Sequence, residues 1–205
     1  MAKEPLVTWE AGRLLTLTDG VFAIVMTLMV LDIKIPEGLD HADFMVAFVK
    51  MGNTVFLYFL SFLILSKSWI GHHARFNEIA RVDRVFLGIS LTSLALVALV
   101  PVATNLVGDY PGETIAAVAY CGLFFLIGII DLWGWLYASK DSRLLASPLT
   151  PETLVMVLRI RLILPIVALI AGVVSLAMGA NALYIFLAII FVLPLTMKSI
   201  RHVGT

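Results

Sequence analysis

The sequence predicts an all-α membrane protein with six transmembrane helices. Of its 205 residues, 61% are hydrophobic and only 14% are charged, whereas a soluble domain is about 45–50% apolar and about 25% charged. Six apolar runs are each long enough to cross the roughly 30 Å hydrocarbon core of a bilayer as a helix. The net charge of zero gives no reason to expect a nucleic acid partner, and the single cysteine excludes an intramolecular disulfide framework.

The six expected helices lie within one domain that covers residues 1–205. They span residues 14–35, 50–70, 85–107, 115–138, 157–178 and 181–199. Asp40 with Asp43, and Thr150 followed by Pro151, are typical of helix N-termini. The first run is too long for the apolar part of a signal peptide and ends without a small-residue cleavage site, so we expect it to remain as a helix.

Proline and small residues predict local features of the later helices. Pro101, Pro165 and Pro194 each lie inside an expected span and are predicted to kink it. Small residues recur on the fifth span, which favours close helix packing there.

The basic residues predict which side of the membrane each connection occupies. One side would hold both termini and the connections between spans two and three and between spans four and five. Twelve of the fourteen Lys and Arg residues fall on this side: Lys3, Arg13, Lys67, Arg75, Arg81, Arg84, Lys140, Arg143, Arg159, Arg161, Lys198 and Arg201. The positive-inside rule therefore predicts that both termini are cytoplasmic. The other side carries Lys34 and Lys50 beside six carboxylates, which could attract cations to a pore mouth or be ordinary solvated loop residues.

The first expected helix has two different faces. At about 100° per residue, Ile24, Leu28 and Leu31 fall within a stripe roughly 60° wide, and Thr27 borders it. Ordinary lipid contact or core packing is the simplest explanation of such a stripe. Asp19 lies on the opposite side, where an acid in a spanning helix is either a helix–helix hydrogen bond or an ion or proton site. If the aliphatic stripe lines a pore, the position of Asp19 favours the anchoring role.

Three separated motifs resemble one known family. The stretch from Arg13 to Asp19, in which Leu17-Thr18-Asp19 stands for Phe-Ser-Asp, resembles the signature of the transmembrane protein 175 family, the endolysosomal-type potassium channels and their prokaryotic relatives. The sequences WIGHHARF at residues 69–76 and LVPVATNL at residues 99–106 are similar to the same family, in the same order. The resemblance covers the chain through about residue 112.

This resemblance implies a potassium channel in a prokaryotic cell membrane. It implies a homotetramer, with the first helix of each subunit lining a central pore and with potassium ions, the lipid bilayer and further copies of the chain as its partners. It implies no cofactor and no enzymatic activity. The carbonyl filter sequence TVGYG of ordinary potassium channels is absent from the chain. By position, the resemblance implies a pore constriction of Ile24, Leu28 and Leu31, a contribution of Thr27 to selectivity, and a modest preference for potassium over sodium.

A second set of residues is expected to hold the first helix against its neighbours. These are the motif residues and polar groups of spans two and three: Arg13, Leu17, Thr18, Asp19, Trp69, His72 or His73, and Asn105. Adjacent histidines do not form the i, i+4 pair of a helical metal site. We therefore expect no structural metal, one structural histidine and one exposed histidine. Sensing of cytoplasmic pH is an alternative, because histidine changes charge near neutral pH.

Other functions remain open at this point. A nonselective cation channel or a proton channel is the nearest alternative. A secondary carrier typically has internal repeats and a polar site near the midplane, whereas here the polar residues at membrane depth are few and no repeat is visible. A membrane enzyme would need a catalytic cluster at the interface, and His72, His73, Glu78 and Asp83 match no catalytic spacing.

Overall fold

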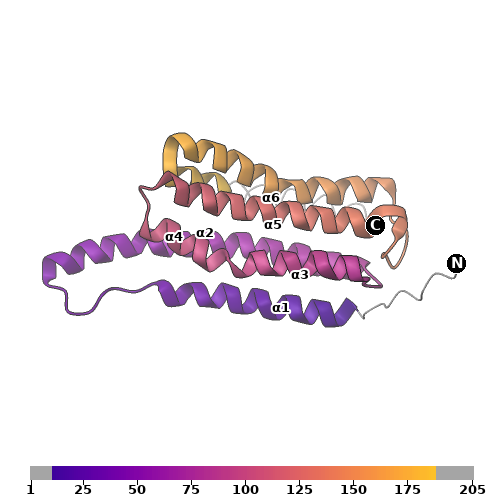
Figure 1. Cartoon of the computed structure of the whole chain (residues 1–205), viewed down its shortest axis with the longest axis horizontal. Coiled ribbons are helices and arrows are strands. Elements are labelled where there is room, and N and C mark those ends of the chain that lie inside the picture. The colour runs from indigo at the N-terminus through magenta and orange to yellow at the C-terminus, as the bar shows by residue number, and fades with distance from the viewer. Residues whose placement is uncertain (1–10, 188–205) are drawn as a thin grey trace.

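The computed structural model describes residues 11–187 and consists of long helices that run side by side along one axis (Figure 1). The α-helices are α1 (Ala11–Leu28), α2 (His41–Glu78), α3 (Arg84–Ala98), α4 (Val100–Asp109), α5 (Thr114–Ser139) and α6 (Pro151–Met178). Shorter 3-10 segments are η1 (Met29–Asp32), η2 (Lys140–Ser142) and η3 (Gly179–Phe186). Within the described residues, the extended pairing is a single antiparallel bridge between Ile79 and Leu145.

Five helical segments of the described part are long and apolar enough to cross a membrane. They are Ala11–Asp32, His41–Glu78, Arg84–Asp109, Thr114–Ser142 and Pro151–Phe186. The first five expected spans are therefore confirmed as helices, although α2 is longer than expected at both ends. The chain is a multi-pass membrane protein. Most of the expected sixth helix, 181–199, and Pro194 within it lie outside the described residues, so six spans remain a prediction.

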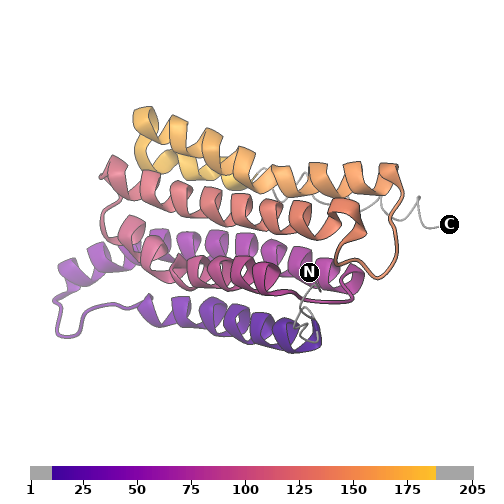
Figure 2. The same ribbon diagram turned by 45° about the vertical axis from the view of Figure 1, so that its right-hand side comes forward.

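The end of α6 leads into η3, which returns along the bundle. Gly179 has a φ of +58°, a backbone conformation that only glycine adopts without strain. After this residue, η3 packs against both α6 and α5, and Figure 2 shows it beneath the end of α6. The start of the expected sixth span is thus a 3-10 segment rather than the first turn of a regular α-helix.

Both helix N-termini expected from capping residues are present. The Asp40 side chain accepts a hydrogen bond from the Asp43 backbone N–H at 2.8 Å, and the Thr150 hydroxyl accepts one from the Thr153 N–H at 3.3 Å. These caps satisfy N–H groups that have no partner inside the helix. The α2 cap explains why that helix begins nine residues before the expected span.

The expected effect of proline differs between two helices. The third span is divided into α3 and α4 at Leu99, two residues before Pro101, whose ring removes one backbone donor and crowds the preceding turn. In contrast, α6 continues past Pro165 as one helix. There the proline ring meets Gly128 of α5, which has no side chain to displace it.

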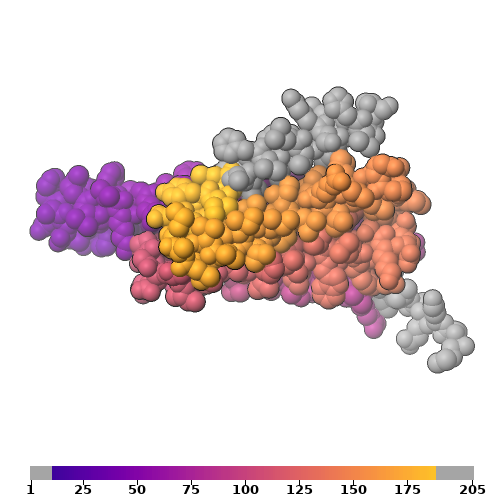
Figure 3. Space-filling view, turned by 90° about the horizontal axis from the view of Figure 1, so that it is seen from above, coloured from indigo at the N-terminus to yellow at the C-terminus, as the bar shows by residue number. Residues whose placement is uncertain are grey.

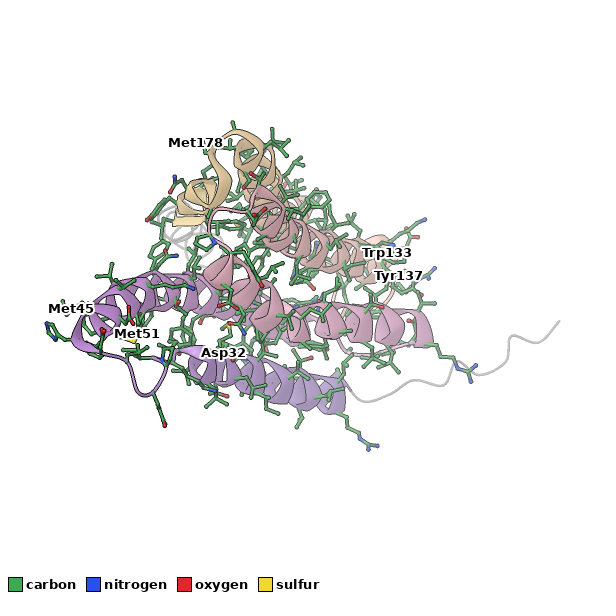
Figure 4. All side chains as sticks on the ribbon, turned by 60° about the vertical axis from the view of Figure 1, so that its left-hand side comes forward. Asp32, Met45, Met51, Trp133, Tyr137 and Met178 are labelled. Carbon is green, nitrogen blue, oxygen red and sulfur yellow. The ribbon has the colours of Figure 1, made fainter. Side chains whose placement is uncertain are left out.

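The helix α5 is the centre of the bundle, and α1 lies at its edge. α5 packs against α3, α4, α6 and η3, whereas α1 contacts α2, α3 and α4, an arrangement visible in Figure 1. The N-terminal part of α2 projects beyond the other helices (Figure 3). This projecting part carries exposed apolar side chains, including Met45 (Figure 4).

Candidate functional site

The edge helix α1 keeps one face in the bundle and presents the other outward. Its buried face consists of Leu14, Thr18, Phe22 and Val25, with Met29 following in η1. On the opposite face, the stripe identified from the sequence is exposed: Ile24 is 59% exposed, Leu28 46% and Leu31 59%. The structure therefore places these three aliphatic side chains on one outward surface of the chain.

Thr27 lies on the same outward face and has its hydroxyl proton engaged. Its Oγ1 is 2.9 Å from the carbonyl oxygens of Ala23 and Ile24, to which it donates within the helix. Because the proton is used in this way, the remaining lone pairs of the oxygen are available to an outside group. Thr27 can therefore act as a weak oxygen ligand at the level of the aliphatic stripe.

The expected contact between Asp19 and the second span is present. The indole Nε1–H of Trp69 donates to Asp19 Oδ1 at 2.7 Å, which satisfies a carboxylate oxygen half-buried between α1 and α2. A hydrogen bond to an ionised group is about twice as strong as a neutral one. This bond ties α1 to α2 on the face opposite Ile24.

Other motif residues of α1 do not join this contact. Thr18 is buried, but its hydroxyl donates to the Leu14 carbonyl within α1 at 2.9 Å. Leu17 is 46% exposed and Arg13 is exposed. The sequence placed all three in one network with Asp19, and this grouping is wrong for Leu17 because its position on α1 turns it to the outward face.

Asn105 hydrogen-bonds to Asp32 of η1, which follows α1, and not to Asp19 of α1. Its Nδ2 donates to Asp32 Oδ2 at 2.7 Å, in η1 just beyond the C-terminal end of α1, where Asp32 is labelled in Figure 4. Asp32 lies thirteen residues after Asp19, which is roughly 20 Å along a helix. The expectation that Asn105 braces Asp19 is therefore replaced by a second attachment of α1, at its other end.

One of the two adjacent histidines is buried and the other is exposed, as expected. His72 is buried with 2% exposure, whereas His73 is exposed and its ring lies beside that of Trp69, with centroids 5.9 Å apart. His72 forms no hydrogen bond with Asp19 or Trp69. Its Nε2 is 3.0 Å from Asp131 Oδ2, and its Nδ1 is 2.6 Å from Arg75 Nη2.

The cluster around Asp131 is the main feature that sequence reasoning missed. Asp131 lies in the expected fourth span and is buried among α2, α3 and α5, where the Ser93 hydroxyl donates to its Oδ1 at 2.8 Å. Arg75 was assigned to a loop because α2 was expected to end at residue 70. Since α2 continues to Glu78, the Arg75 guanidinium lies inside the bundle, with Nη1 4.0 Å from Asp131 Oδ1.

Arg161 is a second arginine that was assigned to a loop and instead lies within a helix. It was counted with the basic residues of the connection between spans four and five although it lies inside the expected span 157–178, and the structure places it in the first half of α6. Its guanidinium stands 5.0 Å from the Trp135 ring and donates to the Gly71 carbonyl at 3.4 Å. The end of the bundle where α1 begins therefore contains two partly or fully enclosed guanidinium groups.

A chain of three buried hydroxyls lies farther from the start of α1 than these charges. Thr104 donates to the Val100 carbonyl at 2.8 Å, so its oxygen accepts from Ser61 at 2.9 Å, and Ser61 in turn accepts from Tyr120 at 2.9 Å. These residues come from α4, α2 and α5. Each of the three apolar runs contains several hydroxyl residues, and the sequence does not reveal that these three meet. Among residues 11–187, no group of three His, Cys, Asp or Glu side chains could hold a metal ion.

The fold and site define a multi-pass helical membrane protein with an outward aliphatic face on its first helix. The family model described as "Endosomal/lysosomal potassium channel TMEM175" matches residues 13–101. A potassium channel of Chamaesiphon minutus is 34% identical over 143 residues, which cover 67% of this chain and 70% of that protein. The chain belongs to the TMEM175 family.

Further relatives agree with this assignment. A potassium channel of Streptomyces collinus is 35% identical over 118 residues, 58% of this chain and 57% of that protein. The endosomal/lysosomal proton channel TMEM175 of Danio rerio is 24% identical over 204 residues, 96% of this chain but 39% of that protein. The matched region thus spans less than two thirds of these two relatives. The crystal structure of a lysosomal potassium-selective channel TMEM175 homolog from Chamaesiphon minutus matches with a TM-score of 0.74 and 26% identity, over 93% of this chain and 97% of that one.

Proposed function

We propose that this protein is a potassium-conducting channel whose pore is lined by α1. The observation that carries the proposal is the division of α1 into two faces. Its polar and aromatic side chains, Asp19 and Phe22, are used against α2, while Ile24, Leu28 and Leu31 face outward from the edge of the bundle. The names of the bacterial relatives, which are potassium channels, support the same function.

A pore lined by α1 requires further copies of the chain, and we propose a homotetramer. Four copies arranged with α1 toward a common axis would cover the outward aliphatic face of each helix. Native mass spectrometry of the purified protein tests the stoichiometry directly. A monomer or dimer in a mild detergent and in nanodiscs would contradict the tetramer.

The mechanism follows from the chemistry of the aliphatic stripe. Rings of Ile24, Leu28 and Leu31 would form an apolar neck that excludes water when it is narrow. A dehydrated ion gains no carbonyl ligands there, so the closed neck is a barrier, and conduction requires it to widen and become wet. The Thr27 oxygens are the nearest polar ligands on the same face. Such a neck would favour potassium over sodium modestly, because potassium holds its hydration shell less tightly.

We propose a prokaryotic inner or plasma membrane location with both termini in the cytoplasm. The start of α1, the end of α2, the starts of α3 and α6 and the end of α5 share one end of the bundle (Figure 1), and the connections at this end are rich in basic residues. Membrane-impermeant thiol labelling tests the orientation. Lys140→Cys should be labelled from the cytoplasmic side and Glu113→Cys from the opposite side, in a Cys121→Ala background.

The decisive functional experiment is an ion flux assay with the protein in liposomes. Wild-type protein should carry potassium faster than sodium, and Ile24→Asn should raise the flux and lower the selectivity by adding a polar ring to the neck. Ile166→Asn is the matched control, since Ile166 is an isoleucine of α6 that is 49% exposed and plays no part in the proposed pore. Unchanged flux and selectivity in Ile24→Asn would overturn the assignment of Ile24 as constriction.

A proton channel is the second candidate, and the names of the vertebrate relatives favour it. In potassium-loaded liposomes, a proton channel would admit protons once valinomycin lets potassium out to balance the charge, whereas a potassium channel would allow the same exchange only with a protonophore present. Single-channel currents would separate either channel from a secondary carrier, whose turnover is too slow to resolve as unitary steps. A nonselective cation channel would pass sodium and potassium at equal rates in the same assay.

A further inference from the structure

The buried His72 imidazole has two neighbours of opposite hydrogen-bonding chemistry. Arg75 Nη2 lies 2.6 Å from Nδ1, and Asp131 Oδ2 lies 3.0 Å from Nε2. A guanidinium has only donors, and an ionised carboxylate has only acceptors. The positions of the ring protons can therefore be deduced from the neighbours.

We infer that Arg75 is a positioning residue that fixes His72 as the neutral tautomer with its proton on Nε2. Because Arg75 donates to Nδ1, that nitrogen must carry a lone pair, and the one ring proton must be on Nε2, where it points at Asp131. A second proton on Nδ1 would set two N–H donors against each other at 2.6 Å. The cluster then contains one positive charge, on Arg75, and one negative charge, on Asp131.

The fixed tautomer has a structural consequence at Asp131. The Nε2–H of His72 donates to one carboxylate oxygen, and the Ser93 hydroxyl donates to the other at 2.8 Å. This joins α2, α3 and α5 through a single side chain. With the other tautomer, two acceptors would face each other at His72 and Asp131, and the connection between α2 and α5 would be lost.

The Arg75 guanidinium is itself fixed by close packing, so it can hold the His72 ring in one orientation. It stands 5.6 Å from the Phe76 ring and 5.4 Å from the Phe86 ring. A Cβ at Gly134 of α5 would lie 3.1 Å from its Nη1, so the guanidinium uses space that only glycine leaves. The other enclosed cation nearby, Arg161 of α6, donates to the Gly71 carbonyl instead.

The His72 ring also supports the first helix. Its centroid is 5.4 Å from that of Phe22, with the two planes tilted by 56°, and Phe22 is fully buried. Phe22 precedes Ile24 by two residues and lies on the opposite face of α1. The orientation of the imidazole, set by Arg75 and Asp131, therefore sets the surface on which α1 rests.

The first test measures the tautomer and does not depend on channel activity. A full-length variant with His41, His73 and His202 replaced by Gln leaves His72 as the only histidine, so its ¹⁵N spectrum needs no further assignment. At pH 7 in nanodiscs we expect one protonated nitrogen, Nε2. A proton on Nδ1, or on both nitrogens, would overturn the inference.

Two substitutions of Arg75 test the cause. Arg75→Met removes the donor to Nδ1 and should convert the single tautomer into a mixture, whereas Arg75→Lys retains a donor and should preserve the Nε2–H form. A single Nε2–H tautomer in Arg75→Met would overturn the role of Arg75. If Arg75→Met does not fold, loss of the Nε2–H tautomer in Arg75→Lys would overturn the inference, and its retention would support it.

A second test asks whether the cluster positions α1, and it rests on the proposed channel function. Potassium flux per folded protein should change severalfold in Arg75→Met, return toward the wild-type value in Arg75→Lys, and stay unchanged in Arg84→Met, an exposed arginine at the start of α3. Wild-type flux in folded Arg75→Met would overturn the positioning role. Absence of flux in the wild-type protein would instead contradict the proposed function and leave the tautomer measurement standing.

Discussion

The contact between α5 and α6 allows a sharp prediction, because it depends on a single glycine. A Cβ at Gly128 would lie 2.6 Å from Cδ, 2.9 Å from N and 3.1 Å from Cβ of Pro165. Carbon atoms do not approach this closely without a shift of the structure. The proline ring cannot rotate away, and its nitrogen belongs to the α6 backbone. Gly128→Ala must therefore push the two helices apart.

The magnitude of this effect can be estimated against a control on the same helix. Overpacking a well-packed core costs about 1–3 kcal/mol, and three contacts with a rigid ring place Gly128→Ala near the upper end. Replacing an unconstrained helical Gly by Ala gains up to about 1 kcal/mol. Gly122 of α5 has no heavy atom within 4 Å of an added Cβ, so Gly122→Ala should show this gain alone. Gly128→Ala has the same gain of about 1 kcal/mol but an overpacking cost of about 3 kcal/mol, so it should be about 2 kcal/mol less stable than the wild type. The two alanine variants should therefore differ in stability by about 3 kcal/mol.

Thermal unfolding in detergent measures this difference. For a domain of this size each kcal/mol corresponds to about 2–4 °C, so the Tm values of the two alanine variants should differ by about 6–12 °C, with Gly128→Ala the lower. Equal Tm values would refute the close approach of Pro165 to Gly128 and, with it, the packing of α5 on α6 described above.

Three further predictions concern the polar groups behind α1 and in the core. Trp69→Phe removes the donor to Asp19 and should lower the Tm by about 2–6 °C, since interhelical hydrogen bonds in membranes contribute up to about 1.7 kcal/mol; Trp133→Phe, at an exposed position, should not change it. Asp19→Ala should reduce the yield of assembled protein in size-exclusion chromatography, and normal tetramers with altered ion preference would count against the bracing role. Ser61→Ala should cost about 1–3 kcal/mol in thermal unfolding because the Tyr120 hydroxyl loses its buried acceptor, and an unchanged Tm would exclude the hydroxyl chain as a stabilising element.

The sequence allowed the helices and the faces of α1 to be predicted, because both follow from local periodicity. Apolar runs separated by turn residues located five spans in order, and Asp40 and Thr150 marked two helix starts within a residue. The stripe of Ile24, Leu28 and Leu31 followed from the helical repeat alone. These features need no knowledge of which helix lies next to which.

The buried polar contacts could not be predicted in the same way, since they join residues far apart in the chain. Asp131 and His72 are 59 positions apart, and nothing local in the fourth apolar run indicates that its acid faces α2. The incorrect expected end of the second span also hid the position of Arg75. With α2 ended at residue 70, Arg75 was counted among the loop residues, so its position inside the bundle beside Asp131 was not predicted.

The attachments of α1 also indicate which part of this helix is easiest to move. Near its middle, the Asp19–Trp69 bond and the packing of Phe22 on His72 lie on the face turned to the bundle. At its C-terminal end, the helix continues only as the 3-10 turn η1, whose hydrogen-bond geometry is poorer than that of an α-helix. The bond from Asn105 to Asp32 there is exposed, and water competes for both partners. If α1 lines the pore, movement that widens it should therefore begin at Leu31 and reach Ile24 last.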